Sequence, residues 1–217
     1  MRKYAVSDLV KEIKVILDRN QESASLIPND SDTLSQGEII KSKIVDAAKA
    51  IEEIAPVSKL DSIGYGSQQV AWTSDNGAYV GQLSLPSNLL RLVRIKVSDW
   101  KRAGTIISDS DEEYLHQQNK YVRGNPQRPI AVLVHIGGVR VLELYTSNSN
   151  TATADLSYVA EPSIGSDGNI ELCALLKDAI LYMAAYLTCI SLGDNQTAVG
   201  YRETAYQLAG IVEPSQT

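Results

Sequence analysis

The spacing of apolar residues along the chain changes twice, from a helical period to an extended one and back again. Near the N-terminus, apolar residues recur at three- and four-residue intervals and predict an amphipathic helix that is capped by Ser7 and buries Leu9 and Ile13. A polar stretch rich in Ser, Asn and Asp follows at residues 20–33 and predicts a long loop.

A second helix is predicted to begin after Ser35, because Ser35 and Glu38 have the spacing of a capping box. Pro56 ends the periodic pattern, since proline cannot continue a helix. The apolar face of this helix is predicted to hold Ile40, Ile44, Ala47, Ala48, Ile51 and Ile54.

From Ile63 onward the apolar pattern is typical of short strands. Gly137-Gly138 separates two apolar runs and predicts a tight hairpin, and Asp75-Asn76-Gly77 predicts another turn. A short acidic helix is expected within residues 110–120. The predicted strands are residues 69–72, 79–85, 89–97, 130–136, 139–145 and 155–159.

After residue 165 the helical period returns. Residues 170–192 are apolar on most faces and predict a central helix, which Gly193 ends. Asp194 then caps a second helix, so the two form an αα-hairpin. The predicted fold class is α+β: N-terminal helices (1–62) and the C-terminal αα-hairpin (166–217) form a helical body, and 63–165 is an inserted antiparallel β-rich region.

The charge and the cysteine content of the chain bear on DNA binding and on disulfides. The net charge is −6 and the pI is near 5, which argues against broad, sequence-independent DNA binding. Cys173 and Cys189 both fall in the predicted central helix, about 24 Å apart along its axis, so we expect two reduced thiols and no disulfide between them.

No membrane span or signal peptide is expected. Lys177 and Asp178 interrupt the most apolar stretch, and the uncharged part that remains, 179–192, is shorter than the roughly 20 residues that a span requires. The N-terminus shows an amphipathic pattern where a signal peptide would have a continuous apolar run.

Residue patterns of known catalytic and metal sites are not found in the sequence. The acidic run at residues 109–113 could bind a cation, but acidic residues also favour a helix start. His116 and His135 have no Cys or His neighbour at ligand spacing. We therefore predict no catalytic residue, no cofactor and no metal.

One basic cluster is present, formed by Arg91, Arg94, Lys96, Lys101 and Arg102. Under strict alternation along a strand these residues do not all share one face. This favours a solvated sheet edge over a surface that follows DNA.

The order of these elements resembles the head-to-tail adaptor proteins of short-tailed bacteriophages, and is most similar to the ring-forming connector proteins of crAss-like phages. The resemblance is carried by loose motifs: Leu85-Pro86-x-Asn88-x-x-Arg91, Asp99-Trp100, Tyr121-x-x-Gly124-Asn125-Pro126, Leu142 to Tyr145, Tyr158 to Pro162, and the hairpin from Cys173 to Ile211.

The resemblance implies a structural virion protein and not an enzyme. Such adaptors form a ring, typically twelve-fold, below the portal in the neck or tail, after assembly in the host cytoplasm. The implied partners are further copies of the chain, the portal protein and tail proteins, with no membrane, while DNA passes through the lumen without specific binding. The candidate interface or lumen residues are Arg91, Arg94, Trp100, Tyr121, Arg123, Lys177 and Asp178.

Two alternatives remain open. The first is a non-viral soluble scaffold or regulatory module with the same α+β architecture. The second is a tail-associated glycan hydrolase that would use two acids from residues 109–113 and Glu161. The sequence sets none of these acids in an apolar stretch that would favour a general acid.

Overall fold

The computed structural model describes residues 1–17 and 35–212 and has an α+β fold, as the sequence predicts. The predicted loop at 20–33 lies outside the described residues, as does the chain beyond Val212.

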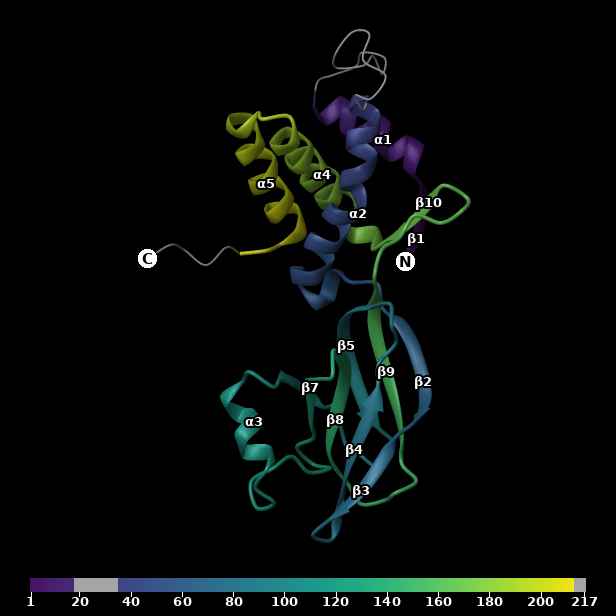
Figure 1. Ribbon diagram of the computed structural model, residues 1–217, viewed down its shortest axis with the longest axis vertical. Coiled ribbons are helices and arrows are strands. Elements are labelled where there is room, and N and C mark those ends of the chain that lie inside the picture. Colours follow the sequence, from purple (N-terminus) through teal and green to yellow (C-terminus); the bar gives the residue numbers. More distant parts are fainter. Residues whose placement is uncertain (18–34, 213–217) are drawn as a thin grey trace. The chain divides into compact units, whose positions relative to one another are not determined.

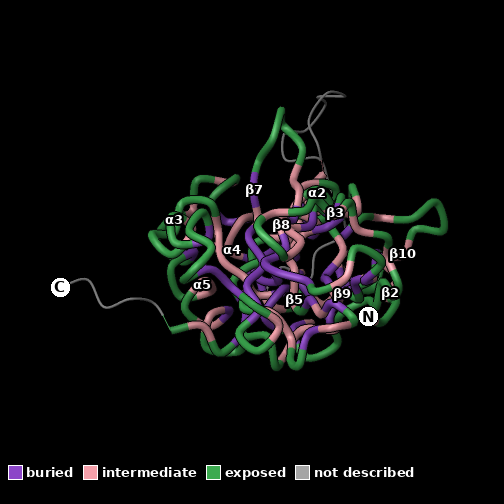
Figure 2. The backbone as a smooth tube through the Cα atoms, turned by 90° about the horizontal axis from the view of Figure 1, so that it is seen from below, coloured by how far each residue is buried: buried purple, intermediate pink, exposed green. Residues whose placement is uncertain are grey.

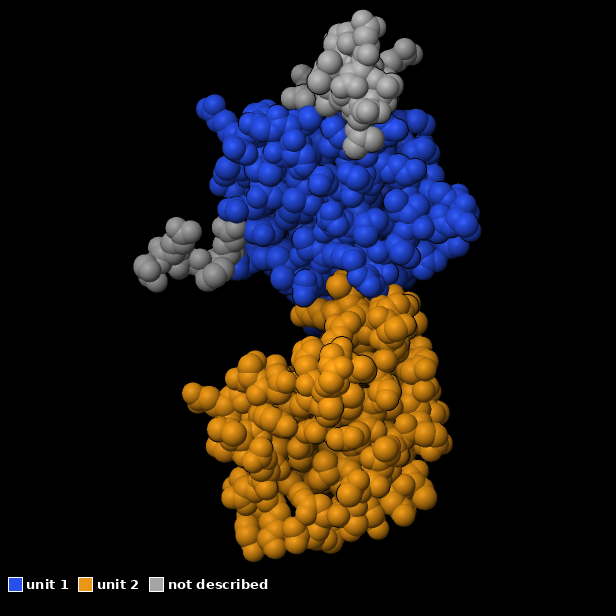
Figure 3. Space-filling view, viewed as in Figure 1, with its two compact units in different colours: residues 1–61, 161–217 blue, residues 62–160 orange. Residues whose placement is uncertain are grey.

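The chain forms two compact units, coloured separately in Figure 3. Unit 1 consists of Met1–Asp61 and Glu161–Thr217, and unit 2 is Ser62–Ala160. The first and last parts of the chain therefore belong to one unit, and the middle part is inserted between them.

Unit 1 is a helical body with a small two-stranded sheet (Figure 1). The helix α4 packs against α1, α2 and α5, and its buried residues include Ala179, Ile180 and Met183. The elements of unit 1 are β1 (Arg2–Ala5), α1 (Val6–Ile16), α2 (Gln36–Ile54), the 3₁₀ helix η1 (Val57–Lys59), β10 (Asn169–Leu172), the 3₁₀ helix η2 (Ala174–Leu176), α4 (Lys177–Ser191) and α5 (Asn195–Ala209).

The predicted start and end of α2 are confirmed. The Ser35 hydroxyl accepts a hydrogen bond from the Glu38 backbone N–H, and the Glu38 carboxylate accepts one from the Ser35 N–H at 2.8 Å. The predicted apolar face is buried up to Ile51, but Ile54 is 49% exposed because it lies in the last turn of the helix.

Two predictions at the ends of the helical body are wrong. Ser7 does not cap α1: the helix begins at Val6, and its N-cap residue Ala5 ends the strand β1. Residues 170–192 are not one helix, because Ile170 and Leu172 belong to β10, which pairs antiparallel with β1. An apolar run of this kind does not distinguish a buried strand from a buried helix.

The cysteines accordingly lie on different elements. Cys173 lies between β10 and η2, whereas Cys189 lies on α4, and both are buried free thiols. The segment Ala174–Ser191 has the length and composition of a membrane span, yet half of it is buried within the protein. Its contacts with three helices are those of a core helix.

Unit 2 is a β-sandwich. A three-stranded sheet has the order β2-β9-β5, and a five-stranded sheet has the order β3-β4-β8-β7-β6. The strands pair antiparallel, as predicted, except that β6 runs parallel to β7. The elements are β2 (Ile63–Gln69), β3 (Ala71–Asp75), β4 (Ala78–Ser84), β5 (Leu89–Val97), β6 (Thr105–Ser108), α3 (Glu112–Gln117), β7 (Ile130–Ile136), β8 (Val139–Ser147) and β9 (Thr153–Ala160).

The inner faces of the two sheets share one core, and the buried strand segments are purple in Figure 2. Ile95 and Leu156 come from the three-stranded sheet, and Leu142 and Leu144 come from the five-stranded sheet. A smaller cluster around Val132 and Tyr145 lies on the other face of the five-stranded sheet, where Tyr114 of α3 packs against it. The predicted β7–β8 hairpin is confirmed, with positive φ at Gly137 and Gly138.

Candidate interaction surface on the sandwich

The structure divides the seven predicted site residues between the two units. Lys177 and Asp178 begin α4 in unit 1, and the other five lie in unit 2. The Lys177 ammonium is 2.6 Å from a Glu12 carboxylate oxygen and 5.6 Å from the centre of the Tyr4 ring. Lys177 therefore connects α4 to α1 and β1.

Asp178 lines a groove of about 540 Å³ within unit 1, formed by α1, α4 and α5. The groove also includes the apolar residues Val15, Leu181 and Leu208. Val15 is 63% exposed.

Trp100 is a core residue of the sandwich and is 2% exposed. Its indole N–H donates to the Thr146 carbonyl oxygen at 2.8 Å. This contact joins the chain after β5 to β8, so the role of Trp100 in this structure is to hold the two sheets together.

Arg91 and Arg94 lie on β5, an edge strand of the three-stranded sheet. The pairing of β5 with β9 contains two register shifts, one before Arg91 and one before Arg94. The shifts break strict alternation and place Arg91, Arg94 and Lys96 opposite Val159, Ser157 and Asp155, which alternate onto one face of β9. The expectation that these cations do not share a face was therefore wrong.

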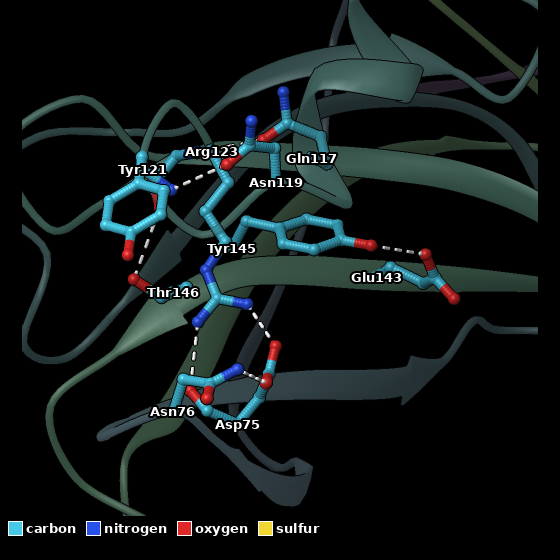
Figure 4. Close-up of polar contacts among 10 residues, drawn as sticks. Asp75, Asn76, Gln117, Asn119, Tyr121, Arg123, Glu143, Tyr145 and Thr146 are labelled. Atoms are coloured by element: carbon cyan, nitrogen blue, oxygen red, sulfur yellow. Dashed lines mark hydrogen bonds and ion pairs between the residues drawn. The ribbon is translucent and has the colours of Figure 1, made fainter.

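Arg123 lies on the segment at residues 119–126, which follows α3 and is named here the Tyr121 loop. The Arg123 side chain is almost fully buried, and its guanidinium forms an ion pair with the Asp75 carboxylate (Figure 4). It also donates to the Asp75 carbonyl oxygen at 3.0 Å. Hydrogen bonding to Arg123 is the main reason that the pKa of Asp75 is lowered. Arg123 thus joins the Tyr121 loop to the β3–β4 turn.

Gln117 provides a second anchor for the loop. This side chain is 1% exposed, and its Oε1 accepts from the Gly124 N–H at 2.8 Å while its Nε2 donates to the Glu113 carbonyl at 3.0 Å. The Thr146 hydroxyl donates to the Gly124 carbonyl at 3.2 Å. Both backbone groups of Gly124 are therefore satisfied by side chains from other elements.

The Tyr-x-x-Gly-Asn-Pro motif has a local physical explanation. A Cβ at Gly124 would lie 2.8 Å from the Tyr145 carbonyl oxygen and 2.9 Å from the Ile130 nitrogen, so only glycine fits without a backbone shift. The Asn125 side-chain oxygen accepts from the N–H groups of Gln127 and Arg128, which closes a turn before β7.

Between these anchors in the sequence, Tyr121 is 85% exposed. In Figure 4 the Tyr121 ring and the Glu143 carboxylate lie on opposite sides of Arg123 and Tyr145. Val122 and Leu115 are also largely exposed, at 60% and 68%. A pocket of about 440 Å³ adjoins Tyr121, lined by the Tyr121 loop, by the β3–β4 turn, and by Thr146 and Asn148. The Tyr121 loop thus exposes two apolar side chains, Tyr121 and Val122, on a segment whose base is fixed.

Three side chains, Glu143 and Tyr145 of β8 and Tyr114 of α3, form a hydrogen-bonded cluster. The Glu143 carboxylate accepts hydrogen bonds from the Tyr145 hydroxyl at 2.9 Å and the Tyr114 hydroxyl at 3.4 Å. Burial, followed by the charge of Glu143, raises the pKa of both tyrosines, so both remain neutral donors at ordinary pH. This cluster fixes α3 against the sheet.

The acidic run at residues 109–113 forms the turn before α3 and its first residues. The Asp111 carboxylate accepts from the Ser108 N–H at 2.7 Å, which closes this turn. Glu161 belongs to unit 1, whereas the run belongs to unit 2. Among the described residues, no group of three His, Cys, Asp or Glu side chains is placed to hold a metal ion.

Sequence reasoning selected Tyr121 and Arg123 but missed Asp75 and Gln117, on which the loop depends. Asp75 lies 48 residues from Arg123, and sequence spacing gives no sign of their contact. The nearest signal was the turn Asp75-Asn76-Gly77, which indicates a local turn and not a partner.

No protein-family model matches the chain, and a comparison with curated proteins also finds no match.

Proposed function

We propose that the chain is a structural subunit of a ring-forming head-to-tail adaptor in a short-tailed bacteriophage, with no catalytic role. The observation that carries the proposal is the Tyr121 loop: an almost fully exposed tyrosine on a segment anchored by the buried side chains of Arg123 and Gln117. The anchors order the loop before any partner arrives.

This arrangement suits a protein–protein contact for two reasons. Tyrosine combines a large apolar ring with a polar tip and is frequent among the residues that dominate binding energy at interfaces. A loop that is already ordered loses less conformational entropy on binding than a flexible one. Tyr121, Val122 and Leu115 would therefore form the centre of a contact with another protein.

The difference in charge between the units supports a ring. Unit 2 contains nine Lys and Arg and eight Asp and Glu, a net charge of +1, whereas the rest of the chain contains eleven and eighteen, a net charge of −7. A closed ring needs two different, complementary surfaces on each subunit. An acidic unit and a nearly neutral unit give each subunit surfaces of different charge, which a head-to-tail contact can use.

In this proposal the ring is typically twelve-fold, lies below the portal in the virion neck, and contacts portal and tail proteins. DNA passes through the lumen. The order of the elements supports this assignment, because a helical unit built from both chain ends with an inserted β-rich unit is the organisation that the resemblance implies.

The proposal is tested by replacing Tyr121 with Ala in the full chain and measuring assembly by light scattering coupled to size exclusion. Tyr121 is exposed, so the variant should keep the melting temperature of the wild type while it loses oligomers or portal binding. Val139→Ala serves as a matched control, since Val139 is an exposed apolar residue elsewhere on unit 2. A wild-type chain that stays monomeric and binds no portal would favour the non-viral scaffold.

A further inference from the structure

The outer face of the three-stranded sheet in unit 2 carries a row of cations. Its inner face packs into the sandwich core through residues such as Ile95 and Leu156. The two register shifts in β5 bring Leu92 and Ile95 into pairs with Tyr158 and Leu156 on the core side. The same shifts place Arg91, Arg94 and Lys96 together on the outer side.

The cations on this face lie at regular steps. Residues that share a face of a strand recur about every 7 Å, because each residue rises about 3.3 Å. Arg94 is exposed, and Arg91 and Lys96 are half-buried, as expected for long side chains whose stems rest on the sheet. Arg91 also interacts within the chain. Lys101 and Arg102 are exposed just beyond the end of β5.

Beside Arg94 and Lys96 the outer face is polar, whereas Val159, opposite Arg91, is fully buried. On β9 the outer face presents Ser157 and Asp155, and the Asp155 carboxylate accepts from the Ser67 N–H at 2.5 Å. On β2, Gly64 pairs with Ser157, and a Cβ at Gly64 would meet open space. A large ligand can therefore approach this face closely, and it would meet charged and polar groups first.

We infer that this face binds the phosphate backbone of a nucleic acid without regard to sequence, through Arg94 and Lys96 with Arg91 beside them. Cations about 7 Å apart on one face of a strand can each contact a different phosphate of one nucleic-acid strand. Unit 2 has a net charge of +1, so the acidity of the whole chain does not describe the environment of this row. The inference concerns the chain itself and does not depend on the ring.

A nucleic acid fits this face better than an apolar protein surface does. Stable protein contacts usually have an apolar or aromatic centre, and the side chains exposed on this face are cationic or polar. With two or three phosphate contacts, log affinity should fall with log salt at a slope between about −2 and −3. This slope weakens binding roughly 16- to 64-fold between 50 and 200 mM salt.

The test is fluorescence anisotropy of a labelled 20-base-pair duplex with the full-length chain, at salt concentrations from 50 to 200 mM. The double variant Arg94→Gln/Lys96→Gln should weaken binding at 50 mM by about tenfold or more and reduce the salt slope by about 2. The matched control Lys41→Gln/Lys43→Gln removes the same charge from α2 in unit 1 and should leave binding unchanged.

Asp155→Asn provides a test in the opposite direction. The amide oxygen can still accept from Ser67, while the negative charge opposite Lys96 is removed, so affinity should rise. A gain cannot result from misfolding. The inference is overturned if the wild type does not bind at 50 mM salt, if the control pair loses as much affinity as the row variant, or if Asp155→Asn leaves affinity unchanged. It is also overturned if the row variant abolishes self-association and leaves DNA binding intact, since the face would then be a subunit contact.

Discussion

The two units build their cores from the chain in different ways. Unit 2 uses one continuous stretch, Ser62–Ala160, and its two sheets enclose a core without help from the rest of the chain. Unit 1 joins two stretches that unit 2 separates. Contacts between those stretches are its distinguishing feature: Lys59 donates to the Leu208 carbonyl at 2.8 Å across 149 residues, and Lys177 pairs with Glu12 across 165.

This difference between a continuous and a divided unit affects how each unit can fold. Closing a long loop costs conformational entropy before the contacts at its ends can stabilise anything. If unit 2 folds first, it shortens the effective loop that unit 1 must close. We therefore expect the inserted sandwich to fold by itself and the helical body to depend on both ends of the chain.

The largest expected effect follows from placing a charge in the helical body. Ala179 on α4 is 1% exposed, so Ala179→Asp buries an unpaired carboxylate and should cost several kcal/mol. Both tryptophans, Trp72 and Trp100, lie in unit 2, so their fluorescence reports on the sandwich alone. Helical circular dichroism should be lost at a lower temperature while the fluorescence transition stays in place.

Leu175→Asp is the matched control for this variant. Leu175 in η2 is 68% exposed, so an added charge there should change stability little. If the two signals of Ala179→Asp shift together by the same amount, the units do not unfold independently and the comparison fails.

A smaller effect is expected from the anchor of the Tyr121 loop. Gln117→Ala leaves the buried N–H of Gly124 without a partner, which should cost about 1–3 kcal/mol. The loss should be visible in the tryptophan transition and not in the helical one. Gln118→Ala is the control, because Gln118 is the exposed neighbour. Equal effects of the two substitutions would show that Gln117 does not anchor the loop.

The smallest effect concerns a buried carboxyl in unit 1. Glu52 on α2 is fully buried, and one of its oxygens accepts from the Cys173 N–H at 2.8 Å while the other has no partner. Burial raises the pKa of Glu52 above its usual value near 4.5. The unfolded chain then loses this proton first as pH rises, so stability falls between the ordinary pKa and the raised one, and the full cost remains at higher pH.

Glu52→Gln should therefore match the wild type near pH 4 and exceed its melting temperature increasingly toward pH 7. The amide oxygen can keep the bond to Cys173. Glu53→Gln is the control, since Glu53 is exposed on the same helix. A melting-temperature difference that does not change with pH would contradict the assignment.

The features that were predicted correctly from the sequence depend on residues that are close together in the chain. The capping box of Ser35 and Glu38, the glycine turn of the β7–β8 hairpin and the cap by Asp194 each involve residues within a few positions of each other. The strands β1 and β10 were missed because each has four residues and its partner lies at the other end of the chain.

The candidate surface was predictable only in part, for the same reason. Tyr121 was found as an unusual residue in a motif, but its anchors come from contacts across the fold. The shared face of Arg91, Arg94 and Lys96 depends on register shifts that alternation cannot reveal. Local patterns therefore identified residues, while their surroundings required the structure.

The proposal that the chain is an assembly subunit is tested most directly by native mass spectrometry of the purified full-length protein, alone and with a portal protein. We expect a closed oligomer of twelve copies, formed either by the chain alone or on the portal, and we expect Tyr121→Ala to lose it. A strictly monomeric chain that binds no portal and is indifferent to the Tyr121 substitution would contradict it.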